Sequence, residues 1–402
     1  MDKILQEIKK YSEVFFDEIV ELRRRIHKNP ELAFEEHETA ALISDFLKQN
    51  NISHTTGIAK TGIVALIRGN NPDLNTIALR ADMDALPIYE KNEVDYKSKN
   101  EGKMHACGHD AHTASLLGAA KILHKLKDSF EGTVKLIFQP SEEKYPGGAK
   151  VMIDEGVLDN PKPAMIFGQH VFPELEAGKV GLKSGKYMAS TDELYFTVKG
   201  KGGHGAIPQK NIDPVLIASH IVVALQQIVS RNSNPALPCV LSIGRFIAEG
   251  QTNIIPDEVK MEGIIRTFDE EWREEMRKRV VKISKGIAQS MGGDCEVRID
   301  QGYPFVFNDP VVTQKARQFA IEYLGEENVT ELELRTTAED FAYFAQQVAG
   351  CFYRLGTRSE KRGITSNLHT ATFDIEEESL KTGMGLMAWL AVKSLKESTG
   401  EE

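Results

Sequence analysis

The densest group of side chains that could bind a metal or react lies in residues 104–112, MHACGHDAH. A thiolate and an imidazole are strong ligands for zinc-like ions, so Cys107 and His109 are candidate metal ligands. A helix expected just after them would favour the thiolate form of Cys107. The same residues also allow a Cys–His nucleophile pair or a buried structural cysteine. For His105 and His112, a supporting role behind the ligands is as compatible with the pattern as ligation.

Two adjacent carboxylates form the second candidate group. Glu142 and Glu143 follow the apolar segment 133–138, which has the pattern of a buried strand. One carboxylate can coordinate a metal while its neighbour stays free as a base that acts on water. A solvated loop is the alternative. Open α/β sheets bind ligands outside the carboxyl ends of their strands, however, and the pair occupies such a position.

Four more residues share that position at the end of an expected strand. The strands are expected at 76–81, 164–167 and 351–355, and the residues after them are Asp82, Asp84, His170 and His369. Because the carboxyl ends of parallel strands meet at one sheet edge, we expect these side chains to gather there with those of Cys107, His109 and Glu143. Five to seven ligands are too many for one tetrahedral ion and suit two ions that share a bridging ligand.

A glycine-rich stretch, GKGGHGA at 200–206, is a third candidate group. Its glycines would let the backbone approach a ligand and would leave His204 exposed. Asn253 and Arg266 are polar candidates for binding a substrate carboxylate. A plain hairpin turn is the alternative for the stretch. It follows a strand but opens no helix, which excludes a dinucleotide-binding fold.

The elements that must position these residues alternate between strands and helices. A helix is expected over the first 27 residues and another over 36–49. Strands at 62–67, 76–81, 133–138 and 164–167 and a helix at 111–127 come next, and a helix at 311–323, a strand at 351–355 and a helix at 377–395 end the chain. This order is typical of an α/β domain with a mostly parallel sheet.

The pattern changes between these two parts. Strands are expected at 191–199, 238–246, 258–267 and 295–300, with helices at 213–230 and 270–289. The order β-α-β-β-α-β is the split, ferredoxin-like α+β arrangement. We therefore expect a catalytic domain formed by residues 1–184 and 301–402, with an inserted lid or dimerisation domain at 185–300.

Composition excludes several classes of protein. The 402 residues include 49 Lys and Arg against 59 Asp and Glu, a net charge of −10, which argues against a nucleic-acid partner. No apolar run approaches the roughly 20 residues that span a bilayer, so no membrane insertion is expected. The charged N-terminal stretch lacks the apolar core of a signal peptide. Four cysteines make no disulfide framework, which favours a reducing, cytoplasmic location.

Several motifs in order give the chain a family resemblance. They are LRRRIHKNPELAFEEHETA from Leu22, ALRADMDALPI from Ala78, MHACGHDAHTASLLGAA from Met104, FQPSEE from Phe138, GKGGHGAIP from Gly200, NIIP from Asn253, RTF from Arg266 and EDFAYFA from Glu339. The sequence resembles, almost end to end, the amidohydrolase branch of the aminoacylase/carboxypeptidase metallopeptidase family. That branch includes hippurate hydrolases, N-acyl-amino-acid amidohydrolases and plant auxin-conjugate hydrolases. The resemblance implies a dinuclear metal catalytic domain and a smaller lid domain that commonly dimerises.

The resemblance also implies roles for most of the candidate residues. Cys107 would be a bridging thiolate, with Glu143 and His369 completing one metal site and His109 and His170 the other. Glu142 would be the general acid/base. The resemblance leaves the role of Asp84 open, and we expect Asp84 to orient a ligand. His204 would approach the scissile carbonyl as an electrophile, from its own or the partner subunit, and Asn253 would help to hold the substrate carboxylate.

The function implied is metal-dependent hydrolysis of N-acyl-amino acids to a carboxylic acid and a free amino acid. Two divalent ions are expected, Zn²⁺ or Mn²⁺, with Co²⁺ or Ni²⁺ as further options. The alternatives are an N-acetyl-diaminopimelate deacetylase or a dipeptidase of the same family, and a non-catalytic binding protein on this fold. Gly302-Tyr303-Pro304, where one carboxypeptidase branch has Gly-Arg-Pro, argues against glutamate-type substrates. A homodimer is expected, with a tetramer as the larger option.

Overall fold

The computed structural model describes residues 2–398, and the chain divides into two compact units. The first unit comprises the chain up to Gly185, Phe307–Glu333 and the chain from Asp340. The second comprises Lys186–Val306 and the short segment Leu334–Glu339. The sequence did not indicate that this short segment leaves the first unit, because it has neither helical nor strand periodicity.

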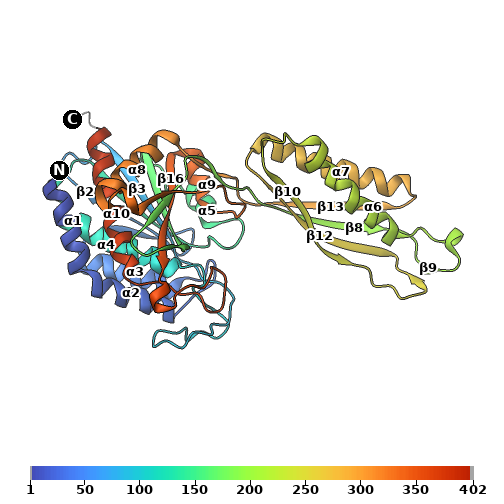
Figure 1. The fold of residues 1–402 in the computed structure, drawn as a ribbon, viewed down its shortest axis with the longest axis horizontal. Helices are drawn as coiled ribbons and strands as arrows, with labels where there is room; N and C mark the ends of the chain where they lie inside the picture. Colours follow the sequence, from blue (N-terminus) through green and yellow to red (C-terminus); the bar gives the residue numbers. More distant parts are fainter. Residues whose placement is uncertain (1, 399–402) are drawn as a thin grey trace. The chain divides into compact units, whose positions relative to one another are not determined.

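The first unit is built on a mixed eight-stranded sheet in the order β1-β2-β4-β3-β5-β16-β6-β15 (Figure 1). The strands are β1 (Ser53–Ile58), β2 (Gly62–Arg68), β3 (Thr76–Asp82), β4 (Thr133–Gln139), β5 (Met165–Glu176), β6 (Val180–Leu182), β15 (Val329–Glu331) and β16 (Ala349–Arg358). The central pairs β4–β3, β3–β5 and β5–β16 are parallel, as is β6–β15. The expected mostly parallel α/β sheet is confirmed.

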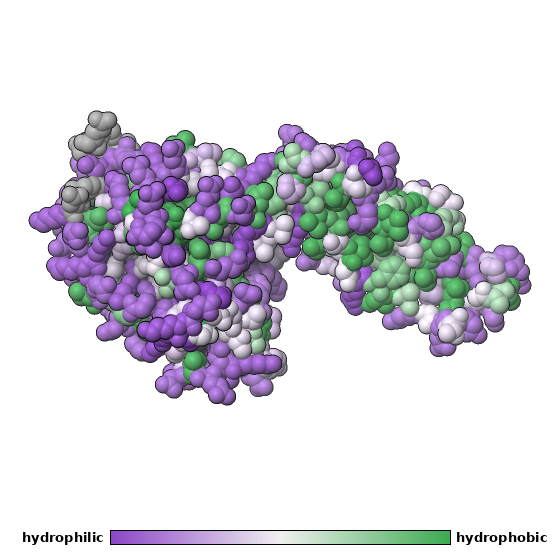
Figure 2. Space-filling view, in the orientation of Figure 1, coloured by the Kyte–Doolittle hydropathy of each residue, from purple (hydrophilic) through white to green (hydrophobic). Residues whose placement is uncertain are grey.

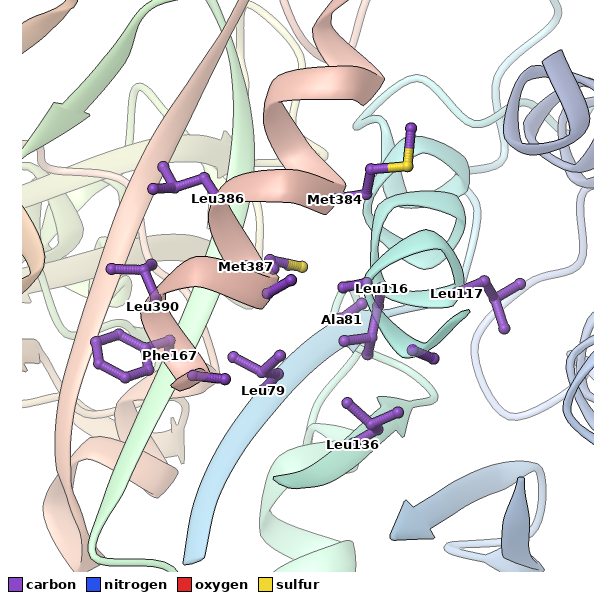
Figure 3. Close-up of a cluster of buried hydrophobic side chains, with 14 of the residues drawn as sticks. Leu79, Ala81, Leu116, Leu117, Leu136, Phe167, Met384, Leu386, Met387 and Leu390 are labelled. Carbon is purple, nitrogen blue, oxygen red and sulfur yellow. The ribbon is translucent and has the colours of Figure 1, made fainter. Parts of the chain in front are cut away.

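Two helices cover the middle of this sheet and form the core with it. Side chains from β3, β4 and β5 pack against α4 (His109–Lys125) and α10 (Ser379–Ser398) (Figure 3). The helices approach closely at Gly118, where an added Cβ would lie 2.7 Å from Sδ of Met384. Every position of β3 and β4 is buried, as expected for strands covered on both faces, and this includes the charged side chains of Arg80 and Lys135.

Further helices complete the first unit. They are α1 (Asp2–Val14), α2 (Phe16–Lys28), α3 (His37–Gln49), α5 (Gly148–Asp154), α8 (Pro310–Leu324) and α9 (Phe341–Gln347). The single N-terminal helix expected from the sequence is wrong, since α1 and α2 are separate and only Phe15 lies between their ends. The interruption is local because the N–H of Phe15 still bonds to the Tyr11 carbonyl at 2.9 Å. The short α5 and α9 were not predicted.

One predicted strand boundary needs correction. His170 was expected to follow a strand, but β5 continues through it to Glu176. The reason is tertiary: β16 pairs with β5 along this length, and Arg354 is the register partner of His170. The hydrogen bonds of a neighbouring strand therefore extend β5 beyond its apolar N-terminal half.

The second unit has the expected ferredoxin-like order. Its elements are β8 (Asp192–Lys199), α6 (Pro214–Gln227), β10 (Cys239–Ile247), β12 (Glu258–Thr267), α7 (Glu270–Ser290) and β13 (Asp294–Gln301). The strands form an antiparallel sheet in the order β10-β12-β8-β13. Asp213 and Asp269 cap the two helices through backbone N–H groups, and a separate core fills the space between helices and sheet.

One helical segment of this unit is long and apolar enough to cross a membrane by length and composition alone, Pro214–Asn232. A single such segment is weak evidence for a membrane span. Ile217, Ile221 and Leu225 on it are buried in the core of the second unit. Its other side exposes Leu216 and Val223, with 50% and 73% of their surface accessible. Apolar surface gathers on the second unit in Figure 2.

Candidate metal centre

Cys107 occupies the tight turn that leads into α4. Gly108 follows it with a left-handed φ of 81°, and an added Cβ there would lie 2.4 Å from Cγ2 of Val171. Glycine is therefore required for the turn. The turn leaves Sγ of Cys107 3.4 Å from Nε2 of His170 and 3.4 Å from Nε2 of His369. The thiol thus lies between two imidazoles that come from distant parts of the chain.

Two of the histidines are held by their Nδ1 atoms. Nδ1 of His109 donates to a carboxylate oxygen of Asp84 at 3.1 Å, and Nδ1 of His170 donates to the Val171 carbonyl at 2.8 Å. When Nδ1 carries the proton of a neutral imidazole, the lone pair is on Nε2, which is the atom available to a metal. Nε2 of His109 is buried and has no hydrogen-bond partner within residues 2–398.

The two glutamates lie in the turn after β4, and two residues separate them from the end of the strand. Oε2 of Glu142 and Oε1 of Glu143 each lie 4.0 Å from Nε2 of His109. Oε1 of Glu143 is also 3.2 Å from Nε2 of His369. Glu142 is buried, with 6% of its surface accessible. This turn therefore places the Glu143 carboxylate near the Nε2 atoms of both His109 and His369, and the Glu142 carboxylate near that of His109.

His369 reaches the cluster from an irregular segment between β16 and α10. Its φ of 60° lies in the left-handed region, which is uncommon for a residue with a side chain. The backbone N–H of His369 donates to the Ala106 carbonyl at 2.8 Å and fixes this segment beside the Cys107 turn. The side chain remains 54% exposed, so this part of the cluster is open to solvent.

Of the five groups of side chains in the described part of the chain whose donor atoms could hold an ion, two share Cys107. Cys107, His109 and His170 offer atoms within 4.8 Å of one another, and so do Cys107, Glu143 and His369. Two three-residue groups with a common thiolate fit two ions joined by a bridging ligand. The unpartnered, buried Nε2 of His109 is the atom that such an ion would satisfy. The residues present thus fit a dinuclear metal site.

The charge of the cluster favours a cation. Burial lowers the pKa of His109, but the carboxylates of Asp82, Asp84 and Glu143 outweigh this effect and raise it to about 10. Burial and the cation of Arg354 hold the pKa of His170 well below its usual range, so this imidazole is neutral. The raised pKa of His109 shows that the surrounding carboxylates favour a positive charge at this position, and a bound metal ion would supply that charge.

The thiol of Cys107 does not follow the expectation from the helix N-terminus. Burial raises its pKa well above the usual range, and the carboxylates of Glu143, Glu142 and Asp82 raise it further. Desolvation and like charges therefore outweigh the helix dipole, and without a bound cation the group is a neutral thiol. This arrangement supports metal ligation rather than a free thiolate nucleophile, because a metal is what would stabilise the thiolate.

Asp82 lies behind the cluster rather than open to an ion. Its Oδ2 accepts from Nη1 of the buried Arg80 at 2.6 Å, and its Oδ1 accepts from Nδ1 of His112 at 2.5 Å. Nε2 of His112 in turn accepts the N–H of Val171 at 2.8 Å. Both nitrogens of His112 are thus occupied, and Asp82 and His112 brace the strand that carries His170.

Sequence reasoning missed the buried charge network that supports this edge of the sheet. Nη2 of Arg80 donates to Asp340 at 2.9 Å, and Gln139 bonds to both residues. The N–H of Ala149 also donates to Asp340, at 3.0 Å. Asp340 belongs to the EDFAYFA motif, but no spacing rule connects residues 260 positions apart, so only the motif itself was a signal.

The three candidate substrate-binding residues, His204, Asn253 and Arg266, lie at two separate places in the second unit. His204 and Asn253 lie together, because the N–H of Gly205 donates to the Asn253 carbonyl at 2.9 Å and Ile254 pairs with His204 in a short two-stranded ribbon. The His204 side chain is exposed. Arg266 lies near the C-terminal end of β12. Burial lowers the pKa of Arg266, and the carboxylates of Glu193 and Asp192 oppose that shift.

Comparison with known proteins gives consistent results. Residues 78–393 match the family described as Peptidase family M20/M25/M40. The chain is 41% identical over 303 residues to an N-acyl-L-amino acid amidohydrolase of Geobacillus stearothermophilus, covering 75% of this chain and 81% of that protein. It is 40% identical to thermostable carboxypeptidase 2 of Saccharolobus solfataricus, covering 94% and 95%. The crystal structure of the Bacillus subtilis YXEP protein, described as a dinuclear metal binding peptidase from the M20 family, superposes with a TM-score of 0.80 at 34% identity, covering 96% and 99%.

Proposed function

The chain belongs to peptidase family M20/M25/M40 and is a hydrolase, and we propose that it cleaves the amide bond of N-acyl-amino acids, releasing a carboxylic acid and a free amino acid. The observation that carries this proposal is the pair of ligand groups that share Cys107, with the carboxylate of Glu142 beside them. The relative from G. stearothermophilus, named for this activity, supports the substrate class.

Cys107, His109 and His170 would hold one divalent ion, and Cys107, Glu143 and His369 the other. Bound divalent ions supply Lewis acidity that activates water and polarises the amide carbonyl. Thiolate and imidazole ligands favour Zn²⁺, whereas the carboxylate and the exposed side of the site also admit Mn²⁺, Co²⁺ or Ni²⁺. We propose Zn²⁺ or Mn²⁺ as the resident pair.

Glu142 is proposed as the general base and acid. Its carboxylate takes the proton from the attacking water and returns it to the leaving amine when the amide bond breaks. The backbone N–H groups of Glu142 and Glu143 both donate to Asp84 at 3.0 Å, which fixes the two side chains relative to His109. Asp84 is therefore proposed to orient the ligand set rather than to react.

The lid is proposed to supply the groups that bind the substrate. His204 would donate to the developing oxyanion, a contribution typically worth about 3–4 kcal/mol in the barrier. Asn253, which lies beside His204 in the second unit, would bind the substrate carboxylate. Arg266 is a further candidate for binding that carboxylate because its guanidinium is positively charged. Its Nη1 is buried and has no hydrogen-bond partner within residues 2–398, so this atom has a donor to offer.

The decisive experiment measures release of free amino acid from N-acetyl-, N-benzoyl- and indole-acetyl-amino acids. The protein is first stripped with chelator and then reloaded with Zn²⁺, Mn²⁺ or Co²⁺. We expect hydrolysis of at least one member only after reloading. Silence on every substrate with two ions bound would contradict the substrate class, and a failure to bind metal would contradict the site itself.

A peptide-type substrate is the second candidate, because a relative of nearly the same length is named a carboxypeptidase. Dipeptides and N-acetyl-diaminopimelate therefore belong in the same panel. Preferential cleavage of either would assign the chain to that specificity. A non-catalytic binding protein is opposed by the complete set of candidate ligands around Cys107.

We further propose that the protein works as a homodimer in the cytoplasm. Leu216 and Val223 form an exposed apolar side on α6, and β10 is an edge strand of the second unit's sheet. All four cysteines are unpaired, in keeping with a reducing compartment. Val223→Glu should convert the dimer to a monomer in light scattering, whereas a wild-type monomer or an unaffected tetramer would contradict this interface.

A further inference from the structure

The PELAFEE segment beginning at Pro30 has no part in the site described so far, yet it contains a fully buried carboxylate. Glu36 precedes α3 but does not cap it. Its Oε1 accepts the N–H of Phe34 at 3.0 Å and that of Ser141 at 2.8 Å, and its Oε2 accepts from the Thr61 hydroxyl at 2.6 Å. Two of these three donors come from remote segments.

The residue that Glu36 holds is in an unusual conformation. Ser141 has a φ of 50°, in the left-handed region that favours glycine, and it immediately precedes Glu142. Such a conformation persists only where the surroundings stabilise it. The Ser141 carbonyl is also held, since it accepts the N–H of Gly148 at 2.7 Å.

Three consecutive backbone N–H groups therefore donate to two buried carboxylates. Ser141 donates to Glu36, and the next two residues, Glu142 and Glu143, donate to Asp84. A carboxylate in the interior is costly unless it accepts such bonds, and burial raises the pKa of Glu36 above its usual value. The direction of the two glutamate side chains follows from the path of this backbone.

We propose that Glu36 is a positioning residue: it holds Ser141 in the left-handed conformation and thereby aims the carboxylates of Glu142 and Glu143 at the metal cluster. An apolar residue of similar size would leave the Ser141 N–H without a buried acceptor. A glutamine keeps the shape but presents an NH₂ group to one of the donors. The metal-binding consequence does not depend on the substrate, whereas the consequence for turnover rests on the proposed function.

The test compares Glu36→Gln with Glu31→Gln as a matched control. Glu31 lies in the same segment, and its carboxylate accepts from the N–H groups of Glu38 and Thr39 at the start of α3 without touching the 141–143 turn. Zn²⁺ affinity is measured by competition with a chelator, and kcat and KM on the best substrate of the panel. Glu36→Gln should weaken binding of the Zn²⁺ assigned to Cys107, Glu143 and His369. It should also lower kcat by about 10–100-fold with KM unchanged. Glu31→Gln should change neither.

Addition of Ser141→Gly to Glu36→Gln tests the route of the effect. Glycine adopts a positive φ without support, so part of the lost Zn²⁺ affinity should return. Wild-type affinity and kcat in Glu36→Gln, equal losses in Glu31→Gln, or no recovery on adding Ser141→Gly would each overturn the proposal. If Glu36→Gln does not fold, Thr61→Val, which removes one donor from the carboxylate, should show the same losses to a smaller extent. A wild-type protein that binds Zn²⁺ but hydrolyses nothing would refute the proposed function and leave the affinity test valid.

Discussion

Oδ1 of Asp84 lies 3.1 Å from Nδ1 of His109 and accepts a hydrogen bond from it. The same carboxylate accepts the backbone N–H groups of Glu142 and Glu143. One buried side chain therefore fixes an imidazole from α4 and two carboxylates from the turn after β4. Partners of this kind, which hold metal ligands without touching the ion, set ligand orientation and basicity.

Replacing Asp84 by asparagine should weaken metal binding by about 10–100-fold, because the amide accepts with one oxygen where the carboxylate accepts with two. Zn²⁺ affinity from chelator competition checks this. Asp95→Asn, on the exposed part of the following loop, is the control and should bind as wild type. Unchanged affinity in Asp84→Asn would show that the His109 and glutamate geometry does not depend on this carboxylate.

Glu142→Gln should retain two ions per chain but lose turnover by about 10²–10⁴-fold, since the amide cannot take a proton from water. Metal analysis and kcat are measured on the same preparation. The neighbouring Glu143→Gln provides the contrast: it should lose metal, because its Oε1 is the carboxylate atom nearest His369. A fully active Glu142→Gln would contradict the assignment of the base.

Cys107→Ala should bind fewer than two ions, because both ligand groups contain this thiol. Metal content by elemental analysis is the measurement. A catalytic nucleophile would behave differently: alkylation would abolish activity while the metal content stayed at the wild-type value.

Metal binding by the wild-type protein should strengthen as the pH rises through the neutral range. The pKa of Cys107 is raised well above its usual value by burial and by Glu143, so the proton must leave before the thiolate can bind an ion. Zn²⁺ affinity measured in a pH series tests this. An affinity independent of pH would show that neither the Cys107 thiol nor His109 has to lose a proton before an ion binds.

His27 should make stability depend on pH. Burial and Arg23 lower its pKa, but Asp110, 2.7 Å from Nδ1, and Glu90, 3.2 Å from Nε2, outweigh them and raise it above the usual value. Because the folded-state pKa is the higher one, the stabilisation is complete below about pH 6.5 and is lost as the pH rises through the folded-state pKa.

Urea unfolding of the metal-free protein in a series from about pH 6 to about pH 9 measures this loss. His27→Gln should show a shallower decline than the wild type over the same range. Parallel curves for the two proteins would mean that His27 is not protonated in the folded state at the lower pH.

Much of the catalytic unit could be predicted from the sequence. The apolar runs of β3 and β4 exceed what a loop contains, and residues at the ends of such strands must meet at one sheet edge because parallel strands share a direction. That rule indicated Glu143 and His369, the local cluster at 104–112 indicated Cys107, and the family motifs implied their roles. The ferredoxin-like order of the second unit followed from periodicity in the same way.

The charges behind the site could not be predicted, because they depend on contacts between residues far apart in the chain. The pattern around Cys107 predicts a thiolate beside a helix N-terminus, but burial among carboxylates makes it a thiol until a cation binds. Asp82 and Asp84 look equivalent by position, yet Arg80 and His112 occupy the first while His109 binds the second. The sequence by itself determined which residues reach the sheet edge. Only the tertiary structure decided which of them bring their donor atoms together and which hold their neighbours, because desolvation and hydrogen-bond partners depend on the packed surroundings.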